Sequence, residues 1–352
     1  MIDKKYCMSS FMAFRFIEKD DVDFYEGLRH KVYKRIPEDE KMVVSTAADI
    51  DNAIQTLLGE HIQSYKKPAL LLSGGMDSGI LASYLEGADA YTFRFLGGSF
   101  QEDELQRAKA FSEKYHLNLH YVDIDWNHTV EKYINRVMIA KSAPVHSIEP
   151  QIMQAAAEAK ANGNDIMVIG ASSDDVFGGI DKLLSVDWTY QAFIKRFMYT
   201  DPALVLKEPV SMDYSFRPYK QGEMIDYMGF LDANSTIETD LSFQNAFETA
   251  ELDFFDPYAC MKLGVELDLY KIRHGQSKYL IRELFSKKYP EYPVPEKLPM
   301  PRPVDIYFKD WTGPKREEFR SDINMDELTG NQKWQLFSLE RFLDIFEPRA
   351  AK

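Results

Sequence analysis

The chain has 352 residues, of which 45% are hydrophobic and 28% charged, and its formal net charge is −14. This composition excludes disordered, collagen-like and low-complexity proteins, and the length allows two or three domains with a core that needs no cross-links. The acidic balance argues against a general nucleic-acid or anionic-membrane surface, so we expect neither partner. The two cysteines, Cys7 and Cys260, form no CxxC pair and predict free thiols.

The amino-terminal residues give the weakest pattern in the chain. Their apolar core is too short for a signal peptide, and no stretch approaches ~18 uninterrupted apolar residues. We therefore expect a cytoplasmic protein. The alternating run at 11–17 predicts a strand, and the charged stretch that ends at 41 predicts an irregular segment. Residues 1–45 are interpreted as an approach segment to the first domain.

Strands and helices alternate from residue 46 to residue 179. The apolar spacing predicts a helix at 46–62, a buried strand at 69–72 and a helix that starts near 79. The same pattern continues with strands at 91–95, 119–124 and 165–170, and with helices at 102–115, 129–141 and 150–160. This order predicts an α/β fold, a parallel sheet with helices on both faces, whose ligands bind at the carboxyl ends of the strands.

Residues 180–352 lose that alternation. Helices are expected at 185–198, 239–251 and 278–288, followed by a proline-rich segment at 289–303 that we expect to lie extended over the surface. We interpret this part as a helical region that completes the substrate site. Candidate pocket residues between 180 and 280 are Asp181, Lys182, Asp187, Tyr190 and Arg217.

The most informative segment is Ser73-Gly74-Gly75-Met76-Asp77-Ser78, directly after Leu72 and the first buried strand. Adjacent glycines let backbone N–H groups approach an anion, and the two serine hydroxyls can donate to phosphate oxygens. No lysine of the GxxxxGK[ST] loop is present. Asp77 beside phosphate is explained by an intervening Mg²⁺ ion, since this cation takes carboxylate and phosphate oxygens together. The alternative is a plain strand-to-helix turn capped by Asp77.

Here the chain resembles the pyrophosphatase-loop (PP-loop) ATP-dependent ligases, whose SGGxDS signature it matches at each fixed position. Residues 169–179, IGASSDDVFGG, resemble the GEGxDExFGG segment of the asparagine synthetase class, which includes β-lactam synthetases. Residues 102–104, 254–257 and 275–282 resemble its acidic DE, PFLD and GxxKxxLR segments. The resemblance covers about residues 46–305. It implies an adenine nucleotide alpha hydrolase-like sheet with a helical extension at the carboxyl-terminal end.

The resemblance also implies a set of site residues. ATP would be bound by Leu72, Ser73, Gly74, Gly75, Asp77, Ser78 and Gly170, and Mg²⁺ by Asp77 and Asp174. Lys278 and Asp174 would be catalytic, with Lys278 neutralising charge at the reacting phosphate or acyl oxygen from the same helix side as Arg282. The alternatives are a solvated turn for Asp174, a surface lysine for Lys278, an exposed helix charge for Glu104 and a structural role for His146.

Three positions depart from the class. Ala171 stands where the class has the glutamate of GEG, which manages the proton of the attacking nitrogen, and Asp175 replaces the second acidic residue. Loss of a positioned base typically costs ~10²–10⁴-fold, so another group or another nucleophile is expected to act. Only 72 residues precede Ser73, and Ile2 replaces the nucleophilic cysteine of glutamine-hydrolysing members, so we expect no glutaminase domain.

These observations favour an ATP-dependent, AMP-forming ligase. It would adenylate a carboxylate, release pyrophosphate and transfer the acyl group to ammonia or an amine. The nitrogen would come from free ammonia, from an amine substrate or from a separate glutaminase, and a carrier protein and a homo-oligomer are left open. Two other functions are a non-catalytic nucleotide-binding paralogue, suggested by Ala171, and a PP-loop RNA-modifying enzyme, which the acidic charge disfavours.

Overall fold

A computed structural model describes residues 1–96, 101–296, 300 and 302–349 of the chain. Its centre is a five-stranded, fully parallel sheet with the strand order β4-β3-β2-β5-β8. The strands are β2 (Pro68–Leu71), β3 (Asp89–Phe95), β4 (Asn118–Ile124), β5 (Ile166–Val168) and β8 (Asp253–Phe255). The predicted α/β class with a parallel sheet is therefore confirmed.

Successive residues of the central strands enter two different hydrophobic cores, as the two-residue repeat of a strand requires. In β2, Ala69 and Leu71 belong to one core, whereas Leu70 belongs to the other. Both faces of the sheet are buried, and this explains why the strands are apolar runs without alternation.

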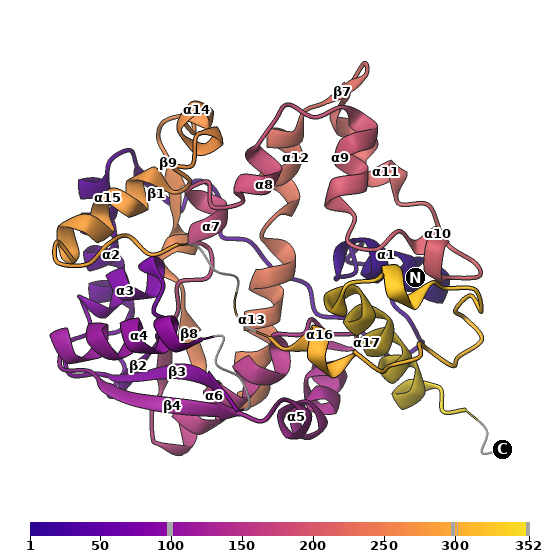
Figure 1. Ribbon diagram of the computed structural model, residues 1–352, viewed down its shortest axis with the longest axis horizontal. Helices are drawn as coiled ribbons and strands as arrows, with labels where there is room; N and C mark the ends of the chain where they lie inside the picture. The colour runs from indigo at the N-terminus through magenta and orange to yellow at the C-terminus, as the bar shows by residue number, and fades with distance from the viewer. Residues whose placement is uncertain (97–100, 297–299, 301, 350–352) are drawn as a thin grey trace.

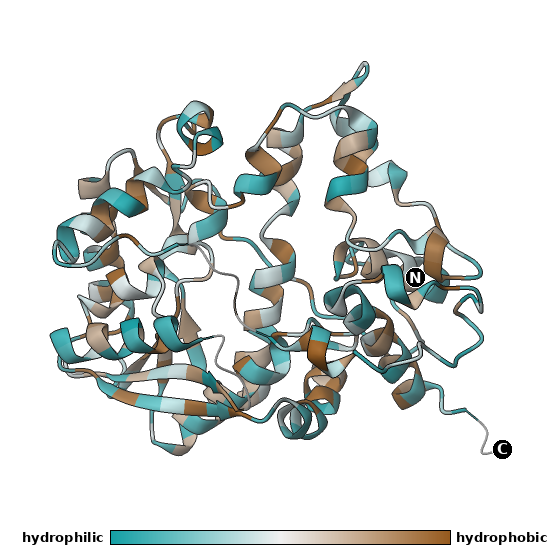
Figure 2. Cartoon of the chain, viewed as in Figure 1, coloured by the Kyte–Doolittle hydropathy of each residue, from teal (hydrophilic) through white to brown (hydrophobic). Residues whose placement is uncertain are grey.

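Helices cover each face of the sheet (Figure 1). One core contains α2 (Ala47–His61), α3 (Met76–Ala82), α4 (Glu102–Lys114) and α15 (Tyr279–Lys288). The other core contains α5 (Trp126–Lys141), α6 (Glu149–Ala161) and α13 (Ile237–Ala250). Figure 2 shows hydrophobic and hydrophilic residues together on these helices, as expected for amphipathic helices that cover a sheet.

The rest of the described chain forms a helical half beside the sheet (Figure 1). Its longer helices are α1 (Lys4–Phe14), α9 (Tyr190–Phe197), α12 (Tyr227–Asn234) and α17 (Gly330–Phe346). Short helices are α7 (Ser173–Val176), α8 (Asp181–Leu184), α10 (Pro202–Val205), α11 (Asp213–Phe216), α14 (Leu269–Arg273), α16 (Val304–Tyr307) and three 3₁₀ turns, η1 (Arg217–Tyr219), η2 (Pro257–Cys260) and η3 (Met325–Glu327). Two small sheets pair β1 (Met42–Val44) with β9 (Met261–Leu263) and β6 (Lys220–Gln221) with β7 (Met224–Ile225).

Three expectations from the sequence were wrong. The strand expected at 11–17 is the end of α1, whose residues from Tyr6 to Phe14 are buried on all sides and so show no helical stripe. The sheet does not end at residue 179, because β8 pairs with β5 from far along the chain. The proline-rich segment is not confined to the surface, since Tyr289 is fully buried and Pro295 lines a cavity. Residues 297–299 and 301 of that segment lie outside the described residues.

Within the described ranges, no helix is both long and apolar enough to cross a membrane.

Candidate active site

The site lies where the two central strands of the sheet end. β2 and β5 are neighbours, but β2 continues through α3 to β3 on its other side, so the chain direction switches between them. In open parallel sheets this switch point opens a crevice for ligands at the carboxyl ends of the strands. The segments that follow β2 and β5 are the two loops that resemble the PP-loop ligases.

The loop after β2 is held by its own serines. The Ser73 N–H donates to Ser78 Oγ at 3.0 Å, the two hydroxyl oxygens are 3.0 Å apart, and the Gly75 N–H donates to Ser73 Oγ at 3.3 Å. These bonds curl the backbone into a compact turn before α3. Such a turn presents backbone amides to an anion.

Gly74 lets this loop press against α4. Its φ is +74°, and a Cβ at this position would lie 2.2 Å from the Glu104 carbonyl oxygen. Arg107 of the same helix donates from Nε to the Gly74 carbonyl at 3.0 Å. A side chain at position 74 would therefore push the loop away from α4 as well as strain the backbone.

Lys278 joins the two loops through their aspartates. Its ammonium lies 2.5 Å from Asp77 Oδ1 and 2.9 Å from Asp174 Oδ1, and its side chain is 2% exposed. Burial opposes the charge of Lys278, but the two carboxylates outweigh burial and raise its pKa. The Ser173 hydroxyl also donates to Asp77 Oδ1, at 2.7 Å. The structure thus brings all three predicted groups together.

Lys278 reaches this position from a different local structure than expected. It is not on one side of a helix with Arg282, because it precedes α15 as its N-cap with φ +55°. Gly179 makes room for it, since a Cβ there would lie 2.7 Å from Lys278 Cδ and 2.3 Å from Asp174 Oδ1. The second of the two glycines that end this loop therefore serves the packing of the lysine.

The residues present fit a Mg²⁺ ion that is bound together with phosphate. Asp77 and Asp174 keep 25% and 35% of their side-chain surface exposed, so both remain accessible to an ion. No cluster of three metal-ligating side chains exists among the described residues. Mg²⁺ commonly takes one or two carboxylates and completes its shell with phosphate oxygens and water.

A cavity of about 400 Å³ continues from the first loop along the sheet. Its lining includes the predicted residues Leu72, Ser73, Asp77, Ser78, Gly170 and Asp174. A smaller cavity of about 90 Å³ beside it is lined by Gly75, Arg107 and Lys278. The smaller cavity thus combines two cations with the carboxyl groups of Asp77, Glu104, Asp174 and Glu296.

Glu104 and His146 both line the larger cavity. Glu104 is half-buried rather than exposed, and burial raises its pKa to about 7, with Arg107 acting in the opposite direction. His146 is 6% exposed, and burial, followed by the charges of Arg15, Arg302 and Lys141, holds its pKa well below the usual range. The imidazole is therefore neutral, and its Nε2 accepts a bond from Arg15 Nη1 at 2.9 Å.

Three charged residues of this cavity were missed in the sequence. Arg15 follows α1, Glu238 lies in the first turn of α13, and Arg302 lies near the end of the proline-rich segment. Arg15 Nη2 pairs with Glu238 Oε2 at 2.8 Å, and Arg302 Nε bonds to Asn331 Oδ1 at 2.8 Å. No motif marks these positions, and only the fold brings them to the strand ends.

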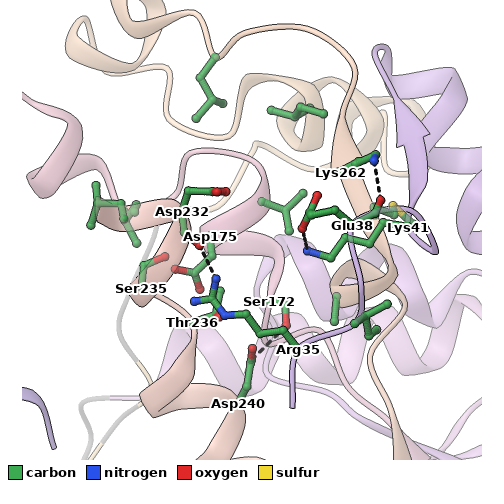
Figure 3. A pocket seen from close by; sticks show the side chains of 18 of the residues that line it. Arg35, Glu38, Lys41, Ser172, Asp175, Asp232, Ser235, Thr236, Asp240 and Lys262 are labelled. Carbon is green, nitrogen blue, oxygen red and sulfur yellow. Dashed lines mark hydrogen bonds and ion pairs between the residues drawn. The ribbon is translucent and has the colours of Figure 1, made fainter. Parts of the chain in front are cut away.

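A third cavity, of about 320 Å³, lies behind the second loop (Figure 3). Ser172 donates there to Asp240 Oδ1 at 3.2 Å and, through its backbone N–H, to Asp256 Oδ2 at 2.7 Å. Burial and then Asp256 raise the pKa of Asp240 to about 7. Asp240 and Asp256 thus hold the second loop from the side away from the cavity of about 400 Å³.

The pocket residues expected between 180 and 280 line none of these cavities. Tyr190 bonds to Asp213 at 2.9 Å, and Asp187 pairs with Arg273 at 2.6 Å. That expectation was wrong because it relied on residue type without the direction of each helix.

The parallel sheet, the SGGMDS turn and the paired aspartates define an α/β nucleotide-binding protein of the PP-loop class. A family model described as asparagine synthase matches residues 49–235, slightly more than half of the chain. The chain therefore belongs to the asparagine synthase family, whose members are ATP-using synthetases. Among curated proteins no match is found.

Several solved structures match part of this chain at low identity. A glutamine-dependent NAD⁺ synthetase from Acinetobacter baumannii is 16% identical, with a TM-score of 0.29 over 42% of this chain and 29% of its own. An NMN synthetase from Francisella tularensis is 10% identical, with a TM-score of 0.30 over 73% and 99%. The U34-tRNA thiolase NcsA from Methanococcus maripaludis is 13% identical, with a TM-score of 0.30 over 71% and 82%. The chain spans less than a third of the Acinetobacter enzyme.

Proposed function

We propose that the protein is an AMP-forming ligase that joins a carboxylic acid to ammonia or an amine. In the first step a carboxylate oxygen attacks the α-phosphate of ATP, and the bond between the α- and β-phosphates breaks. In the second step the nitrogen attacks the acyl carbon, and AMP leaves with the electron pair of the C–O bond. The observation that carries this proposal is the Lys278 ammonium held between Asp77 and Asp174 beside the SGGMDS turn.

The chain's own groups have distinct parts in this proposal. The backbone of the turn and the guanidinium of Arg107 bind the departing pyrophosphate. Lys278 is fixed before substrate arrives, so it neutralises charge at the reacting phosphate without reorganisation, which is the efficient form of electrostatic stabilisation. Mg²⁺, held by Asp77 and Asp174, would supply further neutralisation of the phosphate charge.

The experiment is a pyrophosphate-release screen with ATP, Mg²⁺, ammonium chloride and a panel of carboxylic acids, in which AMP is scored against ADP. We expect AMP and pyrophosphate in equal amounts with at least one acid. ADP as the product, or binding of ATP with no turnover by any acid, would refute the ligase. The second outcome would favour the non-catalytic paralogue.

Asp77→Asn tests the carboxylate within the same screen. The amide keeps the shape of the side chain but weakens both the Mg²⁺ site and the pair with Lys278, so we expect AMP formation to fall by ~10² or more. The melting temperature should change little, because Asp77 is partly exposed. If this variant releases pyrophosphate as fast as wild type, Asp77 has no part in the reaction.

A further inference from the structure

Ala171 leaves the family's proton-handling position without an acidic group, and one carboxylate of this chain faces the same space from another element. Ala171 lines both the nucleotide cavity and an adjoining cavity of about 370 Å³. Two acidic side chains in the described part of the chain line both of these cavities, namely Asp174 and Glu238. Asp174 is paired with Lys278. Glu238 is therefore the acidic side chain that lines both cavities beside Ala171 and lies outside the Lys278 cluster.

The surroundings of Glu238 leave its carboxylate half satisfied. The residue is 7% exposed, and its Oε2 is bound by Arg15 at 2.8 Å. Its Oε1 accepts no hydrogen bond, and the nearest imidazole nitrogen, His146 Nδ1, is 3.4 Å away. A buried carboxylate oxygen without a donor costs free energy, and a ligand N–H that enters the junction would remove this cost.

The contacts of His146 and Arg15 fix the charge state around Glu238. Arg15 can only donate to Nε2, and the Ile148 backbone N–H donates to Nδ1 at 3.3 Å, so both ring nitrogens of His146 face donors other than Glu238. Arg15 is braced in turn by the Tyr199 ring, 4.3 Å from its guanidinium carbon.

We propose that Glu238 takes the place of the glutamate missing at Ala171, binding the attacking ammonia or amine through an N–H and accepting its proton. As the C–N bond forms and the C–O bond to AMP breaks, the electron pair leaves with the AMP phosphate. The proton lost by the nitrogen passes to the Glu238 carboxylate. This inference rests on the proposed ligase function and adds the residue that handles the nucleophile.

Two other carboxylates with altered pKa values fit this role less well. Asp240 faces the cavity behind the second loop and is bonded to Ser172, away from the nucleotide (Figure 3). Glu104 lines the cavity of about 400 Å³ and the cavity of about 90 Å³, but it does not line the adjoining cavity of about 370 Å³ on the other side of Ala171. Glu238 alone, among the described acidic residues outside the Lys278 cluster, borders both sides of Ala171.

The test separates the two half-reactions in Glu238→Gln, with the acid identified by the screen. Exchange of labelled pyrophosphate into ATP reports adenylation and should stay within about twofold of wild type. Amide formation from ammonium chloride should fall by ~10²–10³, in the range expected for a lost general base. Hydroxylamine is less basic than ammonia, so after attack its nitrogen gives up its proton to water more readily, and it should recover most of the rate. Glu248→Gln is the matched control, since Glu248 lies on the same helix, is exposed and pairs with Lys31.

Restoring the family residue gives an independent arm. Adding Ala171→Glu to Glu238→Gln should return at least tenfold of the lost amide-forming rate, which a merely structural role of Glu238 would not allow. The proposal is overturned if exchange falls as much as amide formation, if hydroxylamine shows the same deficit, or if the double variant recovers nothing. Each of these results leaves the ligase function itself standing.

A crystal of the wild-type protein soaked with AMP and methylammonium chloride tests the binding claim without turnover. We expect the nitrogen within ~2.7–3.2 Å of a Glu238 carboxylate oxygen. A nitrogen bound at Asp175 or at Asp240 instead would overturn the assignment. This result also decides the role of Glu238 if the screen finds no acid, so the failure of one proposal is distinguishable from that of the other.

Discussion

Replacing Lys278 by methionine removes the ammonium but keeps most of the side-chain volume. Two carboxylates then face each other without a counter-ion, and removal of one partner from a fully buried ion pair typically costs about 3–5 kcal/mol. Asp77 and Asp174 retain 25% and 35% exposure, so water offsets part of this cost. We therefore expect the free energy of unfolding to fall by about 2–3 kcal/mol.

Urea denaturation measures this loss, and Lys287→Met on the same helix is the control. Lys287 is exposed and pairs with Glu283 four residues away, so its replacement should change stability by less than about 0.5 kcal/mol. Millimolar Mg²⁺ should recover part of the stability of Lys278→Met, because the two carboxylates would then share the metal ion instead.

The same variant reports on catalysis. AMP formation should fall by ~10²–10³, while ATP affinity, measured by calorimetry, should fall much less, since Lys278 would act on charge in the transition state. Two results would refute this reasoning: a variant as stable as Lys287→Met, or equal losses of affinity and turnover.

Two further predictions follow from the geometry of the loops. Gly74→Ala should weaken ATP binding and cost at least about 1–2 kcal/mol of stability, because φ is +74° and the new Cβ would meet the Glu104 carbonyl. The control is Gly59→Ala in α2, which should be neutral or stabilising because nothing lies within 4 Å of the new Cβ. Equal behaviour of the two variants would contradict the close approach of Gly74 to α4. The pKa of Asp240 is raised to about 7 in the folded state. Between about pH 4 and pH 7 the folded protein therefore holds more protons than the unfolded chain, and its stability falls as the pH rises through this window. Asp240→Asn should remove about 2–4 kcal/mol of this pH-dependent loss of stability. Urea titration at pH 8 should therefore show the variant to be more stable than wild type. Identical pH profiles of stability for the two proteins would show that the carboxyl group titrates normally.

The first loop could be predicted from the sequence because its physics is local. A buried strand, two glycines and a helix-starting aspartate lie within ten residues, and the structure keeps them as β2, the turn and α3. The partnership of Asp77 with Asp174 could also be predicted, since neighbouring parallel strands bring their carboxyl ends to one edge. The position of Lys278 followed only from the family resemblance.

The other half of the candidate site could not be predicted because it is assembled from distant segments. Arg15 meets Glu238 across more than 200 residues of sequence, and a charged residue after a helix or in its first turn is ordinary anywhere on a protein surface. The helix α1 was missed for a related reason. Sequence periodicity reveals a helix only when one side faces water, and α1 is enclosed on every side.

The pairing of β8 with β5 has a consequence for how the chain matures. About 80 residues separate the two strands, so a nascent chain that has emerged only as far as the second loop carries an open sheet edge. Open edges recruit other strands, including those of neighbouring copies. The ribosome must deliver the chain as far as β8 before that edge is closed, and high contact order of this kind slows folding. The order in which the strands appear therefore leaves the edge of β5 exposed until residues 253–255 have been synthesised.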